Sequence, residues 1–105
     1  MAIESTDECP LVIIHWVDSR QPVGSWRYLS DISDPTPVEC ASVGWLLKDT
    51  ADCKLLCPTM GDLESNETQG LGMITIPNSC VVKVERLVEA TSSSRHRLAD
   101  DLAAA

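Results

Sequence analysis

The sequence predicts a small, mainly β domain. Its apolar residues fall in short runs rich in valine and isoleucine, and proline, glycine or aspartate bounds most of these runs. Turn-forming residues recur about every 8–12 positions, which is typical of small β-sandwiches and barrels. The chain has 105 residues, 44% of them apolar, which allows one domain with one core.

The first predicted strands lie before residue 58. Residues 11–17 (LVIIHWV) are apolar on both faces, so we expect this strand to be buried on both sides. Trp26 to Leu29 is expected to form a short extended stretch. Val38 to Leu47 predicts a second long strand, in which Gly44 marks a bulge or a close approach of another segment. Cys53 to Cys57 is predicted to return as the partner strand of a hairpin.

Two more strands are predicted in the second half of the chain. Residues 59–70 are polar and acidic, so we expect an exposed, mobile loop there. Leu71 to Ile76 follows as a short strand, and residues 76–79 predict a tight turn of 3₁₀ type. The last strand, Cys80 to Leu87, alternates between apolar and charged residues. The side chains expected on its dry face are Cys80, Val82 and Val84.

Five strands, a central hairpin and a short turn before the final strand predict a small, partly open barrel of SH3-like or Sm-like type. A fragment of a two-sheet sandwich is the alternative. The barrel domain is expected to span residues 11–87, after an N-terminal extension of residues 1–10. Residues 88–105 predict a flexible or helical tail, because so short a segment does not hold a helix alone. The exposed edge strands of so small a barrel would allow a homo-oligomer joined through them.

The charge balance is strongly acidic, with sixteen acidic residues against eight basic ones and a formal net charge of −8. Direct binding to nucleic acid is not expected, because phosphate contacts need clustered lysine and arginine. The acidity agrees with solubility or with a basic protein partner. Neither a secretory signal nor a run of ~20 apolar residues is present, so a cytoplasmic location without membrane contact is expected.

No pattern of reactive residues points to catalysis, a cofactor or a metal. Five irregularly spaced cysteines predict reduced, mostly buried thiols. Cys53 and Cys57 would lie ~13 Å apart on a strand, too far for one zinc ion. His15 lies among aliphatic residues, which favours a packed or rim histidine over a general base. We therefore expect a protein that is not an enzyme.

The stretch from Arg20 to Tyr28 is the strongest candidate for a ligand-binding site. Its candidate residues are Arg20, Trp26, Arg27 and Tyr28. An aromatic ring beside a guanidinium group can stack on a base and pair with a phosphate. The alternative is that Trp26 plugs one end of the barrel as a packing residue, with Arg27 solvated.

Several short motifs follow one another along the chain. They are a strand ending in Trp-x-Asp at residues 16–18, a second tryptophan at 26, a Ser-x-Gly-aromatic-Leu strand at 42–46, a hairpin at 48–52 and a closing Ile-Pro strand at 76–87. In this order the motifs resemble a loose family of small proteins encoded by tailed bacteriophages. The resemblance covers about residues 11–87.

The resemblance implies an accessory phage protein that acts in the host cytoplasm. Together with the lack of catalytic groups, it leads us to expect a non-enzymatic binding protein. Such a protein would counteract host defence by capturing a host protein or by sequestering a small nucleotide-like signal. Two alternatives are an acidic decoy of nucleic acid that inhibits a host protein, and a structural or assembly component of the virion.

Overall fold

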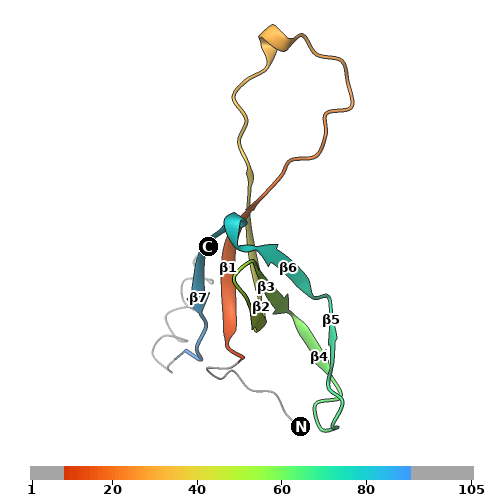
Figure 1. Cartoon of the computed structure of the whole chain (residues 1–105), viewed down its shortest axis with the longest axis vertical. Helices are drawn as coiled ribbons and strands as arrows, with labels where there is room; N and C mark the ends of the chain where they lie inside the picture. Colours follow the sequence, from red (N-terminus) through yellow and green to blue (C-terminus); the bar gives the residue numbers. More distant parts are fainter. Residues whose placement is uncertain (1–8, 91–105) are drawn as a thin grey trace, which may run out of the picture.

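The computed structural model describes residues 9–90 and places most of their strands in one antiparallel sheet (Figure 1). The sheet has five strands in the order β6-β3-β2-β1-β7. Their bounds are Leu11–Asp18 for β1, Val38–Asp49 for β2, Cys53–Cys57 for β3, Ile74–Pro77 for β6 and Val81–Arg86 for β7. The prediction of a mainly β fold is therefore confirmed.

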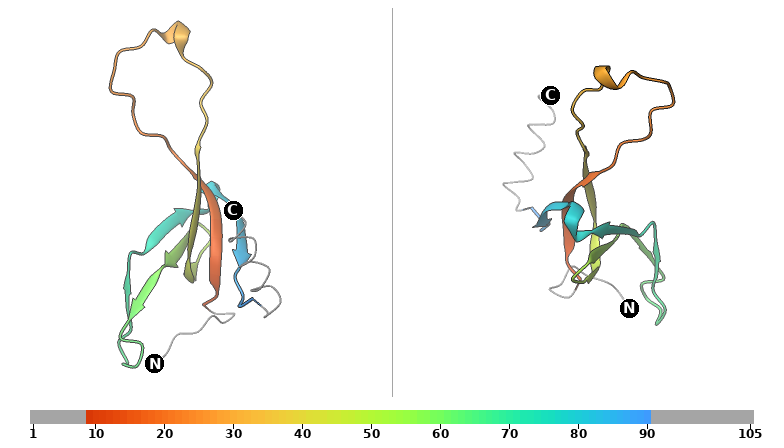
Figure 2. Two further views of the ribbon diagram at one scale, coloured as in Figure 1. Left: turned by 180° about the vertical axis from the view of Figure 1, so that it is seen from behind. Right: turned by 45° about the horizontal axis from the view of Figure 1, so that its top comes forward.

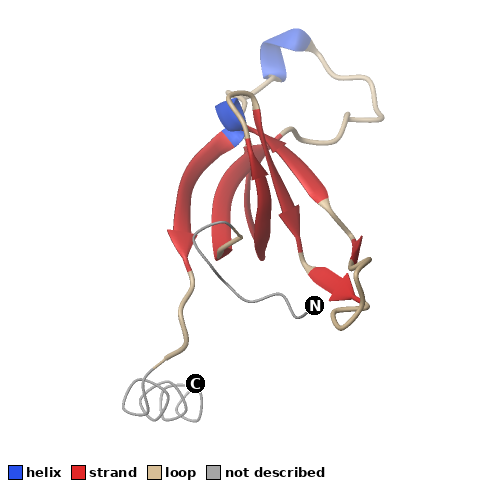
Figure 3. Ribbon diagram, turned by 60° about the horizontal axis from the view of Figure 1, so that its bottom comes forward, coloured by secondary structure: helices blue, strands red, loops and turns tan. Residues whose placement is uncertain are grey.

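The sheet is curved but open (Figure 3). Strands β6 and β7 form its two edges and do not pair with each other, so the sheet is not closed as the predicted barrel would be. The N-terminal strand β1 lies inside the sheet because it pairs with β2 on one side and with β7 on the other. Segments 70 residues apart in the sequence are thereby neighbours, as Ile14 and Val84 illustrate.

The core lies on one face of the sheet and is small. Its fully buried aliphatic side chains are Val12, Ile14, Leu56 and Ile76. Trp16, on the same face, packs against them and donates its indole Nε1–H to Ser42 Oγ at 3.0 Å. Ile13 and His15 of β1 point to the other face and stay half-buried. The expectation that this strand is buried on both sides is therefore correct for one side only.

The turns that join the strands are held by short polar side chains. The predicted hairpin of β2 and β3 is confirmed, and in its turn Thr50 Oγ1 accepts the backbone N–H of Cys53 at 3.0 Å. Asn78 donates its side-chain amide to the carbonyl oxygens of Thr50 and Ala51, which ties the next turn to this one. That next turn is the 3₁₀ turn η2, Asn78–Cys80, as the sequence predicts.

The predicted alternation of the last strand is wrong in detail. The pairing of β1 with β7 shifts register between His15 and Trp16, so Val81 rather than Val82 contacts the core. Val82 is 66% exposed and Val84 is also exposed. A bulge of this kind turns the side chains on either side of it to different faces.

The segment predicted to be a mobile loop contains a second, two-stranded sheet. Its strands are β4, Thr59–Gly61, and β5, Gln69–Leu71. Asp62 begins the connecting loop in the left-handed region (φ 56°), and its backbone oxygen accepts hydrogen bonds from Ser65. Its carboxylate accepts one from the Gln69 side chain at 3.2 Å. These bonds close the loop and give the polar segment a regular form.

Candidate functional site

A long irregular segment leaves the sheet between β1 and β2, and we name residues 19–37 the aromatic arm. It projects from one end of the sheet in every view (Figures 1 and 2). Its one regular element is the 3₁₀ turn η1, Leu29–Asp31, so the extended stretch predicted for Trp26 to Leu29 is not a strand. Pro22, Pro35 and Pro37 lack backbone N–H donors, which prevents the arm from continuing the β1–β2 ladder.

Arg20 holds the base of the arm together. Its Nε donates to the backbone oxygen of Thr36 at 2.8 Å. One terminal nitrogen also lies 3.3 Å from both Thr36 Oγ1 and the Pro37 oxygen. Arg20 is thus placed away from the other three predicted site residues, in a position that fixes the two ends of the arm.

The apolar side chains of the arm are exposed to solvent. Trp26 is as exposed as in an isolated peptide (103%), and Tyr28 and Leu29 are more than 80% exposed. Val23 and Ile32 are more than half exposed as well. The alternative in which Trp26 plugs one end of a barrel is therefore wrong, because the arm carries this ring away from the sheet.

The other three predicted site residues come together on the arm. Trp26, Arg27, Tyr28 and Asp31 line one open hollow. Asp31 was not among the predicted residues, and it is placed there by η1, where its backbone N–H donates to the Tyr28 oxygen at 3.0 Å. The hollow therefore offers two rings, one cation and one anion.

A second hollow lies at the other end of the molecule, between the main sheet and the β4–β5 hairpin, and we name it the methionine pocket. It has a volume of about 350 Å³. Its lining residues are Leu47, Cys57, Met60, Thr68, Gln69, Gly70 and Met73. The sequence did not indicate this pocket, because its residues come from several segments that meet only in the folded chain.

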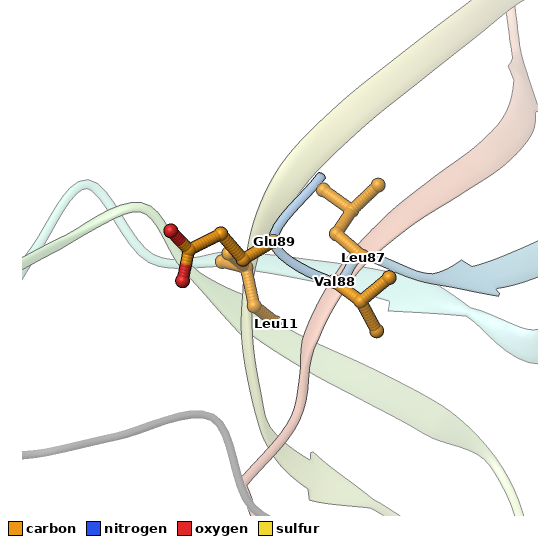
Figure 4. A pocket seen from close by; sticks show the side chains of 4 residues that line it. All are labelled: Leu11, Leu87, Val88 and Glu89. Atoms are coloured by element: carbon orange, nitrogen blue, oxygen red, sulfur yellow. The ribbon is translucent and has the colours of Figure 1, made fainter. Parts of the chain in front are cut away.

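A third hollow lies where the chain leaves β7 (Figure 4). Leu11, Leu87, Val88 and Glu89 line it, and the Leu87 N–H donates to the Leu11 oxygen at 2.8 Å. This hydrogen bond extends the β1–β7 pairing by one residue pair beyond Val12 and Arg86. The hollow holds one carboxylate and three aliphatic side chains, which does not suggest a specific chemistry.

The reactive side chains of residues 9–90 form no grouping of three or more histidine, cysteine or acidic residues that would hold a metal ion. Of the five cysteines only Cys57 is fully buried, so the expectation of mostly buried thiols is wrong. Burial, with a smaller contribution from Cys57, raises the pKa of the Cys9 thiol and makes it a weaker nucleophile at neutral pH.

His15 lies at the rim of an exposed charge cluster. Its Nε2 is 3.6 Å from Glu85 Oε2, and Lys83 Nζ contacts the other oxygen of Glu85 at 2.8 Å. The hydrogen bond and charge of Lys83 lower the pKa of Glu85. The His15 side chain is half-buried, which is the rim position expected from the sequence.

Comparisons with known proteins give no match among family models, curated proteins or solved structures. Within residues 9–90, no helix is long and apolar enough to cross a membrane.

Proposed function

We propose that this protein is a non-enzymatic binding module that captures a partner protein through its aromatic arm. The observation that carries the proposal is the complete exposure of Trp26 next to four further exposed apolar side chains on one projecting segment. Large apolar side chains exposed together on one segment mark interaction sites on soluble proteins. Tryptophan, tyrosine and arginine are also the residues that most often dominate binding energy at protein interfaces.

The arm is partly organised before any partner binds. The three hydrogen bonds of Arg20 hold its base, and the fixed φ of its prolines limits its backbone. The 3₁₀ turn η1 follows directly after Tyr28 and adds a short ordered element. A segment organised in advance loses less conformational entropy on binding, which favours affinity.

The proposed setting is the one that the phage-like motifs imply: an accessory protein that acts in the cytoplasm of a bacterial host against its defence. The finer fold that we propose is of the SH3-like or Sm-like type. The strand order β6-β3-β2-β1-β7 and the 3₁₀ turn before β7 support it. In such a fold the segment between the first two strands is a loop, and loops carry binding residues on a rigid sheet.

Partner capture is expected to depend on Trp26. The tagged protein and its Trp26→Ala variant would be expressed in bacteria and purified at low salt, and the bound proteins compared by quantitative mass spectrometry. We expect the variant to lose its specific partner by about 30-fold or more, since a central aromatic anchor contributes that much to affinity.

Val43→Ala is the matched control, because it also removes exposed apolar surface but lies on the sheet. It is expected to retain the partner. Recovery of the same proteins by both variants, or of none by the unaltered protein, would contradict capture of a host protein through the arm.

The hollow on the arm favours a second candidate, a nucleotide-like ligand. Trp26 and Tyr28 offer rings for stacking and Arg27 offers a cation for a phosphate. The Asp31 carboxylate in the same hollow opposes a phosphate, which is why we rank a protein partner first.

Calorimetric titration with cyclic and linear nucleotides tests this second candidate. If a nucleotide binds, Arg27→Ala is expected to weaken it by removing the cation, and Asp31→Asn is expected to strengthen it by removing the opposing charge. Absence of binding heat for the whole panel, or unchanged affinity in Arg27→Ala, would eliminate the nucleotide.

A further inference from the structure

We infer that the aromatic arm of one copy docks in the methionine pocket of a second copy of this chain. The inference rests on the proposed function in one respect, namely that the arm is the binding element. It adds the identity of a partner, the place where Trp26 is buried and the geometry of the assembly.

The two surfaces are complementary in chemistry. The lining of the pocket is largely apolar and includes Leu47, Met60 and Met73. Its volume of about 350 Å³ lies in the range of pockets that hold a bound group. Methionine side chains adapt their shape and make favourable contacts between sulfur and aromatic rings. Among the described residues, Trp26 has a fully exposed aromatic ring, and such a pocket can bind it.

The charges of the arm and of the loop beside the pocket also permit the contact. The arm has two arginines and two aspartates, so it is neutral, whereas the whole chain has a net charge of −8. The loop beside the pocket runs between β4 and β5 and contains Asp62, Glu64 and Glu67. The arm therefore adds no net repulsion, and Arg27, next to Trp26, offers a cation to the carboxylates of this loop.

The contact has to form between two copies. The arm leaves one end of the main sheet and the β4–β5 hairpin lies toward the opposite end in all views (Figures 1 and 2). The hydrogen bonds of Arg20 join the two ends of the arm at its base, next to the ends of β1 and β2. An arm held in this way does not reach the pocket of its own chain.

The arm and the pocket are different surfaces, so one contact between two copies leaves one arm and one pocket unpaired until the assembly closes. Two copies that exchange arms, or a closed ring of copies, satisfy every arm and every pocket. Each copy then buries its exposed tryptophan.

Sedimentation of the purified protein tests the inference first. The monomer mass is 11.4 kDa, and we expect a discrete larger species as the protein concentration rises. Trp26→Ala is expected to lower the association constant by about 30-fold or more. Met73→Glu, which adds a charge to the pocket wall beside the acidic loop, is expected to do the same. A protein that stays monomeric up to about 1 mM, beyond the range of most functional complexes, would overturn the inference.

A mixture of the two variants gives the decisive result. Trp26→Ala keeps an intact pocket and Met73→Glu keeps an intact arm, so the mixture is expected to form a heterodimer although neither variant self-associates. Val82→Glu is the control, because it adds the same charge to an exposed apolar residue on the edge strand β7. We expect it to associate normally.

Three results would overturn the inference: no heterodimer in the mixture, association unchanged in Trp26→Ala, or association lost in Val82→Glu but kept in Met73→Glu. The last would assign the interface to the β7 edge. If the purified chain is monomeric but a different protein is captured through Trp26, the inference fails and the proposed function stands. If Trp26→Ala changes neither self-association nor capture, both fail.

Discussion

Alanine in place of Ile14 is expected to lower the free energy of unfolding by about 2–5 kcal/mol, the usual cost of removing a fully buried isoleucine side chain. Ile14 is completely buried, in the middle of β1, an interior strand of the sheet. Within residues 9–90 the core contains four buried aliphatic side chains, so few neighbours are available to close the cavity. Since small domains are stable by about 5–15 kcal/mol, this loss is a large part of the total.

Urea unfolding followed by tryptophan fluorescence measures the effect, because Trp16 packs against the same core. Val43→Ala serves as the control, since Val43 pairs with Ile13 of β1 and is half exposed. Val43→Ala is expected to lower the free energy of unfolding by less than about 1 kcal/mol. Equal losses in the two variants would mean that the core does not lie on the Ile14 face of the sheet.

Alanine in place of Gly44 is expected to cost about 1–3 kcal/mol, as overpacking of a close contact does. A Cβ atom at this position would lie 2.7 Å from the backbone oxygen of Cys57 and 2.9 Å from its carbonyl carbon. Backbone atoms cannot turn away as a side chain can, so β2 and β3 would have to separate. Gly44 is thus a site of close approach, one of the two roles that the sequence predicted for it.

Thermal unfolding of Gly44→Ala, with Gly24→Ala as the control, checks this expectation. Gly24 lies in the arm, has no atom within 4 Å of a Cβ built on it and has no positive φ. Its replacement is therefore expected to be neutral or slightly stabilising, because alanine restricts the unfolded chain. A Gly44→Ala variant that melts at the same temperature as the unaltered protein would show that the two strands are not in contact there.

The strands of the main sheet were predictable because their signal is local. The β-branched run of β1, the turn residues around Thr50 and the Ile-Pro step before η2 each determine backbone conformation over a few residues. The β4–β5 hairpin was missed for the same reason. Thr59–Gly61 and Gln69–Leu71 have little strand propensity of their own, and hydrogen bonds from the Asp62 loop hold them together.

Whether the sheet closes depends on long-range geometry that no local pattern encodes. Strand curvature and the register shift between His15 and Trp16 decide how β7 lies against β1, and the sheet remains open. The same register shift exchanges the roles of Val81 and Val82. A shift of one residue moves side chains to the other face of the sheet. The alternation in the sequence therefore predicted the wrong valine at the core.

The sequence by itself determined the mainly β class, the hairpin, the final turn and the adjacency of Trp26, Arg27 and Tyr28, because each depends on residues close together in the chain. Only the tertiary structure decided that these side chains are exposed, since a tryptophan in a small domain is usually packed. The arm projects because prolines end the strand pairing and Arg20 joins its two ends. The methionine pocket, too, exists only where separate strands meet.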